Sequence, residues 1–376
     1  MSLDALIVSA AGGALAKQCP TELSRAVAAQ AAGAPAEPAS QHVTPEMQPR
    51  PGEYNSDVLG GLDLAVAEIS KRNMTATLCL GNMWQWSGGF AAYVFWATGL
   101  RPPRMTPHAT DEDWQAHQNY ASRYYELPEA QELWQRFVAT LLQRFNRHTA
   151  RTYREEPAIL AWQLANEPRP ITHRDAYRKW IVASAAFLRQ RDCGHLISLG
   201  SEGPTPWPSY VGTNLAKDHA VVDYVTVHVW PQNWGWFDPQ NGAGLDSAWA
   251  LAEVYVRGAL TEAERLDKPL VVEEFGLARD AGSYAAGSTT ALRDIFYRRM
   301  CRLIAGGGRA AAGLGFWAWG GEGRPSRPRS VWKAGDALLG DPPHELQGWY
   351  SVYDTDASTL VVIAQCSHML QQAAHN

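Results

Sequence analysis

Apolar and polar residues alternate along most of the chain with two periods, one typical of helices and one typical of short buried strands. From about residue 57, apolar residues three and four positions apart predict amphipathic helices. Between these segments lie short apolar runs, which predict strands buried on both faces. The predicted helices cover residues 57–72, 130–149, 174–192, 247–266 and 288–307, and the predicted strands cover residues 75–82, 159–168, 195–203, 222–230, 268–276 and 310–321.

The order of these segments indicates the fold class. Strands and helices mostly alternate, and each predicted strand ends in polar or aromatic residues, which is typical of a (β/α)8 TIM barrel. A doubly wound sheet is the alternative, but that fold places a G-x-G-x-x-G turn after an early strand, and the sequence contains none. We therefore expect an α/β chain with the barrel fold.

The N-terminal part fits this barrel least well. Eight strands require two near the N-terminus, and only residues 3–11 resemble one. Residues 21–33 resemble a helix, and residues 34–54 are rich in Pro and Ala and predict an extended loop. We expect the first two strands to be incomplete or altered, with an atypical segment at residues 1–50 and the barrel domain at residues 51–376.

Composition narrows the class of protein without identifying it. Of the 376 residues, 46% are apolar and 19% charged, which is a globular profile. The formal charge of −5 gives no reason to expect nucleic acid or an anionic membrane as partner, and no apolar run has the length of a membrane span. The five cysteines are widely spaced and lack a C-x-x-C motif, so we expect buried thiols and neither a disulfide framework nor a zinc site.

The aromatic residues are unusual in kind, with 16 Trp and 14 Tyr against 9 Phe. Such an excess of amphipathic rings is typical of irregular core packing, or of rings held at a surface for the flat faces of sugars. Composition leaves both interpretations open. Trp84, Trp86, Trp234 and Trp236 follow predicted strands beside Gly residues, which predicts open ring faces and favours a polysaccharide groove.

Carboxylates close two of the predicted strands. Glu167 comes at the end of one strand, and Glu273 and Glu274 come at the end of another, about three strand–helix units later. Strand ends share one face of a barrel, and two carboxylates across a sugar are the minimum for glycoside hydrolysis, one protonated as the acid and one ionised as the nucleophile. The alternative is that these residues cap a loop and form surface ion pairs.

Two motifs resemble those of a known enzyme family. "WQLANEPRP" (162–170) and "LVVEEFG" (270–276) resemble the acid/base and nucleophile motifs of glycoside hydrolase family 5, in clan A. "GNMWQWSGGFAAYVFW" and "GFWAWGGEGRP" also resemble the bacterial β-mannanase branch, within a similarity that covers most of the chain. The resemblance implies a (β/α)8 barrel that hydrolyses internal β-1,4-mannosidic bonds of mannan, galactomannan or glucomannan with retention, by double displacement.

The same resemblance assigns roles by position. Glu167 would be the general acid/base and Glu274 the nucleophile, whereas Glu273 would point the other way along an alternating strand and be structural. Many family members have Tyr where this chain has Trp230, which removes one hydrogen bond to the nucleophile. The remaining predicted substrate contacts are Asn166 with the sugar 2-hydroxyl, His228 and Trp230 beside the nucleophile, Trp317 (or Trp319 in a shifted register) under the cleaved sugar, Trp84 in the groove, and Glu202, for which a turn role is the alternative.

One departure from the family concerns the N-terminus. The family opens with a strand carrying a short Asn-Gly turn and a second strand supplying an Arg near the nucleophile, and residues 1–50 show neither. Loss of that cation would disfavour the ionised nucleophile. This departure supports one alternative, a catalytically impaired barrel that only binds polysaccharide. A β-1,4-glucanase of the same family is another, because the sequence does not show how the cleft treats the axial 2-hydroxyl of mannose.

The size of the substrate sets the remaining expectations. A β-mannan or related plant polysaccharide does not enter cells, so we expect a secreted or periplasmic protein. Residues 5–16 form only a weak export signal, because no basic residue precedes them. We expect no metal and no cofactor, no nucleic-acid or membrane partner, and a monomer.

Overall fold

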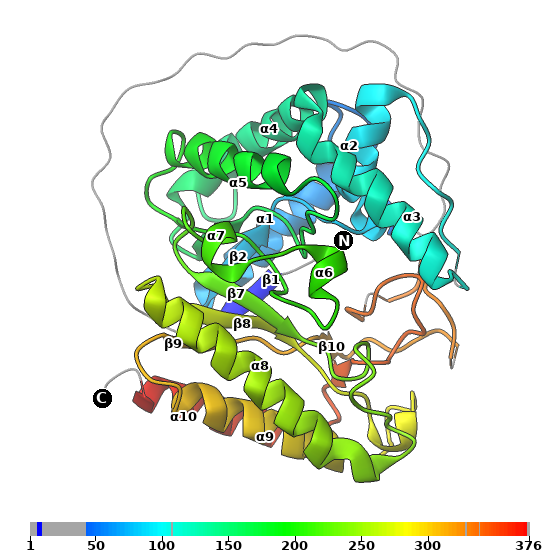
Figure 1. Ribbon diagram of the computed structural model, residues 1–376. Coiled ribbons are helices and arrows are strands. Elements are labelled where there is room, and N and C mark those ends of the chain that lie inside the picture. The colour runs from blue at the N-terminus through cyan, green and yellow to red at the C-terminus, as the bar shows by residue number, and fades with distance from the viewer. Residues whose placement is uncertain (1–5, 10–42, 107, 328, 338, 374–376) are drawn as a thin grey trace. The chain divides into compact units, whose positions relative to one another are not determined.

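The computed structural model (Figure 1) describes most of the chain from residue 43 onward. The helix predicted at residues 21–33 and the first part of the loop predicted at residues 34–54 lie outside the described residues. The predicted division at residue 50 into an N-terminal segment and a barrel domain stays a prediction. The described residues are 6–9, 43–106, 108–327, 329–337 and 339–373.

The first of two compact units comprises residues 1–199 and 210–212. Its main sheet contains, in spatial order, β1 (Leu6–Ser9), β2 (Thr75–Cys79), β5 (Ile159–Gln163) and β6 (Leu196–Ser198). β2, β5 and β6 run parallel, whereas β1 pairs antiparallel with β2. A regular (β/α)8 barrel has only parallel strands, so β1 is not a regular barrel strand.

The main helices of the first unit confirm the three predicted here and add two. The helix predicted at residues 130–149 ends six residues earlier, at Gln143, because the chain turns at Arg144. The Arg144 guanidinium donates two hydrogen bonds, of 2.8 and 2.6 Å, to the Asp63 carboxylate, and the short hairpin of β3 (Phe145–Asn146) and β4 (Arg151–Thr152) follows. These helices are α1 (Ser56–Lys71), α2 (Gly89–Thr98), α3 (Asp111–Ala121), α4 (Pro128–Gln143) and α5 (Arg174–Arg189).

The second unit comprises residues 200–209 and 213–376. Its main sheet contains the parallel strands β7 (Val225–Val229), β8 (Leu270–Phe275) and β9 (Ala311–Leu314), and a smaller parallel pair joins β10 (Trp319–Gly321) to β11 (Val352–Tyr353). The helices between and after these strands are α8 (Leu245–Arg265), α9 (Ala291–Ala305) and α10 (Ala357–Ala373), and the short α7 (Leu215–Asp218) precedes β7. The residues of the short α6 (Pro208–Val211) are divided between the two units.

Burial of β7 and β8 on both faces explains their continuous apolar sequence. α8 packs against β7 and β8, while α9 packs against β9. Val225, Val227 and Val229 of β7 are fully buried together with Leu270 and Val272 of β8. Apart from Thr226 of β7, which is buried and donates its hydroxyl to the Ser201 carbonyl at 3.0 Å, their polar residues come near the ends of the strands. In the described part of the chain, no helix combines the length and the apolar character that crossing a membrane requires.

A disulfide joins the last two helices of the second unit, which lie side by side (Figure 1). Cys301 of α9 and Cys366 of α10 are bonded across 65 residues of sequence. The expectation of buried thiols is therefore wrong for this pair, because helix packing brings together two residues that sequence spacing does not connect. Cys79 of β2 is not part of a disulfide, and its thiol donates to the Gly81 carbonyl at 3.0 Å.

We predict that the disulfide contributes strongly to stability. Closing a 65-residue loop removes conformational entropy from the unfolded chain, which corresponds to about 4 kcal/mol in the loop-closure treatment. Cys366→Ser should lower the free energy of unfolding by that order in urea titrations. The double variant Cys301→Ser/Cys366→Ser should be little worse than the single one, and fully additive losses would contradict a role through the bond.

A buried ion pair lies beside β5 and β6 in the first unit. His195 Nδ1 and Asp192 Oδ2 are 2.6 Å apart, and the Trp162 indole also donates to Asp192 at 2.7 Å. Burial alone lowers the pKa of His195, but the hydrogen bond and charge of Asp192 outweigh it and raise the pKa above 6.5. Burial alone raises the pKa of Asp192, but the hydrogen bond and charge of His195 outweigh it and lower the pKa below 3.8.

This pair should make stability depend on pH. The Asp192 contribution is present above its unfolded pKa, and the His195 contribution is present below its unfolded pKa and is lost as pH rises through the raised folded value. Urea titrations of the wild type and Asp192→Asn should differ more near pH 5.5 than near pH 8.5. An equal difference at both pH values would show that the imidazole does not titrate against Asp192.

Candidate active site

Glu167 lies just beyond the end of β5, in a left-handed backbone conformation with φ of 47°. Its side chain is 8% exposed, and the Trp84 indole Nε1–H donates to Glu167 Oε2 at 2.8 Å. An L-residue adopts positive φ at a cost. The turn at Glu167 therefore redirects the chain out of the strand while the carboxylate stays fixed to a neutral donor.

Two asparagines join the ends of β2 and β5 behind this carboxylate. Asn82 and Asn166 form a parallel bridge between the extensions of the two strands. The Asn82 side-chain oxygen accepts from the backbone N–H of Trp84 at 3.0 Å and from the Asn166 amide at 3.5 Å. The predicted residues Asn166, Glu167 and Trp84 thus lie together in the first unit. The predicted contact of Asn166 with a sugar hydroxyl stays a prediction.

Trp84 is enclosed by other side chains. The Arg169 guanidinium lies 4.8 Å from the centre of its ring, Trp86 stacks on it at 5.7 Å, and Trp114 meets it edge-on at 5.5 Å. Trp84 and Trp86 are each only 8% exposed, and Trp234 of the second unit is 7% exposed. The prediction of open ring faces is therefore wrong for these three rings, because aromatic and cationic neighbours cover them.

Sequence analysis missed Arg169, which is buried and donates to Gln118 Oε1 at 2.8 Å. A guanidinium buried beside a tryptophan needs partners for its donors, and Gln118 of α3 provides one. The signal was present in the sequence, since Arg169 follows the Asn-Glu-Pro triplet directly. Its partner Gln118 could not be predicted, because the sequence pattern did not predict α3.

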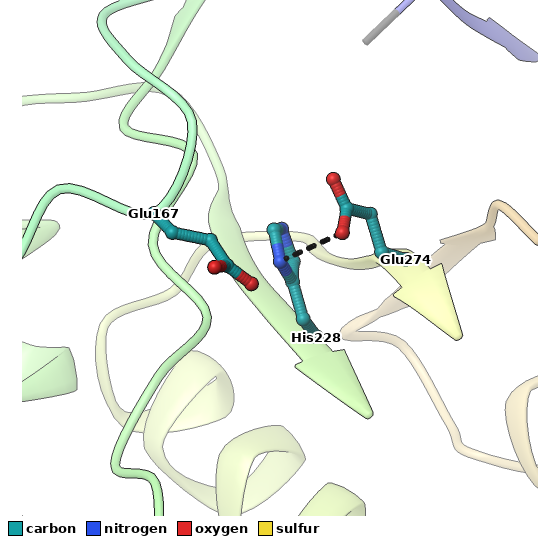
Figure 2. Close-up of side chains that lie close together, drawn as sticks. All are labelled: Glu167, His228 and Glu274. Atoms are coloured by element: carbon teal, nitrogen blue, oxygen red, sulfur yellow. Dashed lines mark ion pairs between the residues drawn. The ribbon is translucent and has the colours of Figure 1, made fainter. Parts of the chain in front are cut away.

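In the second unit, His228 and Glu274 come from adjacent strands. β7 and β8 pair His228 with Glu274, and the imidazole Nδ1 lies 3.2 Å from Glu274 Oε2 (Figure 2). Both side chains are buried, with Glu274 5% and His228 0% exposed. When the imidazole is protonated, its positive charge in this position favours the ionised form of the carboxylate.

Glu273 does not point away from this pair, contrary to the prediction. Its Oε2 lies 3.9 Å from His228 Nε2, and the Tyr224 hydroxyl donates to its Oε1 at 3.3 Å. The strand pairing shifts register between Val227 and His228, so the simple alternation of strand side chains fails at this step. Figure 2 shows the His228–Glu274 pair; Glu167, also labelled there, belongs to the first unit.

Glu202 follows β6 and is 2% exposed. Its backbone carbonyl accepts from the backbone N–H of His228 at 3.1 Å and from the Tyr255 hydroxyl. The main chain of Glu202 therefore anchors the end of β7. The predicted contact of its side chain with substrate stays a prediction.

Trp230 and Trp317 surround the chain where it leaves β8. The Trp317 backbone N–H donates to the Phe275 carbonyl at 2.8 Å, and the Trp230 ring lies 4.8 Å from that of Tyr350. Trp319, the alternative platform, belongs to β10 and is 56% exposed, whereas Trp317 is only partly exposed. Sequence analysis missed Tyr350, whose hydroxyl donates to Asn233.

Gly276 is tightly enclosed by these groups. A Cβ atom there would lie 2.8 Å from Trp230 Cζ3 and 2.9 Å from the Trp317 carbonyl oxygen, closer than carbon contacts allow. Only a residue without a side chain lets the backbone after the nucleophile motif pass between them. The glycine of the Glu-Phe-Gly sequence is therefore required for packing, in addition to the chemical role predicted for the glutamate.

We predict that Gly276→Ala displaces Trp230 or Trp317. Overpacking of this kind costs about 1–3 kcal/mol, and activity should fall with stability because both rings adjoin the end of β8. Gly287→Ala is the matched control, since a Cβ there meets nothing within 4 Å. Thermal melting and assays of the two variants would decide, and a Gly276→Ala protein with wild-type melting would refute the packing argument.

Relatives of known name support a glycoside hydrolase. The chain is 28% identical over 296 residues to mannan endo-1,4-beta-mannosidase 4 of Solanum lycopersicum, covering 74% of this chain and 68% of the relative. It is 29% identical over 289 residues to mannan endo-1,4-beta-mannosidase 7 of Arabidopsis thaliana, covering 72% of this chain and 62% of the relative. The chain thus spans about two thirds of the length of these plant relatives.

Solved structures show the fold class. The glycoside hydrolase family 5 mannosidase of Rhizomucor miehei superimposes with a TM-score of 0.78 at 34% identity, covering 89% of this chain and 80% of that one. The endo-β-1,4-mannanase of Thermotoga petrophila superimposes with a TM-score of 0.66 at 22% identity, covering 86% and 66%, which supports the fold alone. The (β/α)8 prediction is confirmed at the level of fold class.

The family model described as "GH family 5 beta-mannosidase-like" matches residues 22–375, nearly the whole chain. The plant and fungal relatives do not confirm the predicted bacterial branch within it. The family model and the R. miehei mannosidase confirm glycoside hydrolase family 5, which the motifs at Glu167 and Glu274 predicted. This chain belongs to glycoside hydrolase family 5, in its β-mannosidase-like group.

Proposed function

We propose that the chain is a retaining glycoside hydrolase that cleaves internal β-1,4-mannosidic bonds of mannan, galactomannan or glucomannan. The observation that carries the proposal is the buried His228–Glu274 pair at the end of β8, in a member of family 5. A carboxylate held beside an imidazole at a strand end suits a nucleophile. Glu167, at the end of another parallel strand, supplies the acid/base.

The reaction proceeds in two displacements. An oxygen of Glu274 attacks the anomeric carbon, while Glu167 donates its proton to the departing glycosidic oxygen. Glu167 then takes a proton from water, and the resulting hydroxide oxygen displaces Glu274 and restores both groups. The Trp84 indole N–H donates to Glu167 Oε2 and so holds the carboxyl group in position for this proton transfer.

The names of the relatives support the substrate. Two plant relatives are mannan endo-1,4-beta-mannosidases. The R. miehei mannosidase has also been solved as two Glu-to-Ala variants, one of them in complex with mannosyl-fructose. The two replaced glutamates lie about a hundred residues apart in that chain, a separation similar to that of Glu167 and Glu274.

A second candidate is action on the ends of short β-mannosides. It is favoured by the 34% identity to the R. miehei mannosidase, which exceeds that to either plant mannanase named above. A β-1,4-glucanase and a barrel that only binds polysaccharide remain the alternatives from the sequence. The time course of products separates cleavage of internal bonds from cleavage at chain ends. Internal cleavage gives mixed oligosaccharides early, whereas cleavage at the ends gives mannose.

Location, oligomeric state and lineage complete the proposal. A polymeric substrate supports a secreted or periplasmic protein, and we propose a monomer that needs no metal and no cofactor. The similarity of the segments around Trp84 and Trp317 to bacterial β-mannanases supports a place in that branch. Fractionation and light scattering measure the first two properties.

We predict that Glu167→Gln and Glu274→Gln each lower kcat on galactomannan by at least about a thousandfold, because each removes a group that changes protonation or bonding in the reaction. Reducing-sugar release and proton NMR of the first anomer formed are the measurements. The wild type should release the β-anomer first.

Glu129→Gln is the control, since Glu129 is an exposed residue of α4 and should leave kcat unchanged. Wild-type activity in both active-site variants would refute the assignment. Turnover of carboxymethylcellulose in preference to galactomannan would favour the glucanase, and retention on immobilised mannan without any product would favour the binding protein.

A further inference from the structure

Two consecutive carboxylates of β8 contact one imidazole. His228 Nδ1 lies 3.2 Å from Glu274 Oε2, and His228 Nε2 lies 3.9 Å from Glu273 Oε2. The first distance is within the range of a hydrogen bond, and the second is that of an ion pair. The imidazole therefore has a carboxylate at each of its two nitrogens.

The strand register explains how neighbouring residues reach the same ring. Val272 of β8 pairs with Val227 of β7, but the next pair is Glu274 with His228. Between these two pairs β8 contains one residue more than β7, and this additional residue is Glu273. An extra residue of this kind redirects side chains that would otherwise alternate between the two faces.

Burial makes the charges at this step strongly interdependent. The exposed fractions are 2% for Glu273, 0% for His228 and 5% for Glu274, so water screens their interactions little. A neutral imidazole has a proton on only one nitrogen, and a protonated imidazole can donate from both. Carboxylates at both nitrogens therefore stabilise the protonated ring.

Tyr224 and Glu202 also contact the groups around the imidazole of His228 within this unit. The Tyr224 hydroxyl donates to Glu273 Oε1 at 3.3 Å, and so holds the carboxylate by the oxygen other than the one near His228. From the chain after β6, Glu202 contributes its backbone carbonyl to the His228 backbone N–H. Among the titratable side chains of the second unit, Glu273 and Glu274 contact the ring, and Tyr224 contacts Glu273.

We propose that Glu273 is a positioning residue for the reaction, which acts through His228 to keep the carboxylate of Glu274 ionised and correctly oriented. The proposal rests on the assignment of Glu274 as nucleophile. Glu273 acts through the imidazole of His228 and not on the sugar itself. Its negative charge holds a proton on the far nitrogen of His228, and the protonated ring holds Glu274 through the near nitrogen.

The test replaces the charge of Glu273 with minimal change in shape. Glu273→Gln should lower kcat on β-1,4-linked mannohexaose about 10- to 100-fold and leave KM within about twofold, because substrate binding is intact while the attacking oxygen is misplaced. Glu273→Asp retains the charge and should recover part of the loss. Tyr224→Phe, which removes the hydrogen bond to Glu273, should cause a smaller loss of kcat.

Nitrogen NMR of the imidazole provides a readout that a merely structural role would not change. The 15N signals of His228, assigned by their absence in His228→Gln, should show a protonated ring near pH 6 in the wild type and a larger neutral fraction in Glu273→Gln. Asp294→Asn is the matched control, since Asp294 is a buried carboxylate of the same unit that accepts from the Thr359 hydroxyl at 2.6 Å. It should change neither kcat nor the signals.

An unchanged imidazole in Glu273→Gln, or an unchanged kcat in a protein that melts like the wild type, would overturn the proposal. If Glu273→Gln does not fold, Glu273→Asp and Tyr224→Phe decide in the same two measurements. A wild type that hydrolyses no β-mannoside would refute the proposed function, while the NMR comparison would still decide whether Glu273 controls the proton on His228.

Discussion

The register shift between β7 and β8 is the constraint on which the second unit's site depends. It places the carboxylates of Glu273 and Glu274 against the two nitrogens of His228, in strands whose apolar side chains form a buried core cluster. Buried charges are tolerated only when they are paired and hydrogen-bonded. The three side chains therefore stabilise each other, and removal of one partner would leave a buried charge uncompensated.

Packing behind β8 maintains this arrangement. The backbone after Glu274 passes between Trp230 and Trp317 at Gly276, where a side chain has no room. Further along, Arg293 donates to the Leu277 carbonyl at 2.8 Å, and it shares the carboxylate of Asp356 with Arg279. Burial lowers the pKa of Arg293, and Asp356, just before α10, compensates the buried positive charge of this guanidinium. The C-terminal helix thus contributes to the position of the strand that carries Glu274.

Sequence patterns predicted the features that depend on local periodicity. The apolar runs of β5 and β8 were found together with the glutamates that end them, because polar residues begin where burial stops. α2 was missed because apolar residues occupy nearly every position of Gly89–Thr98, which leaves no helical period to detect. The register shift at His228 and the disulfide between Cys301 and Cys366 depend on the pairing of distant segments, which no local pattern contains.

The different environments of the two glutamates determine which role each can take. Glu167 accepts from the neutral indole of Trp84, which adds no positive charge beside its carboxyl group. Glu274 lies against an imidazole that has a second carboxylate behind it, so ionisation is favoured. Carboxylates perform opposite tasks at one pH when their surroundings differ in this way. The acid and the nucleophile are thus distinguished by the indole N–H beside Glu167 and by the imidazole, with its two carboxylate neighbours, beside Glu274.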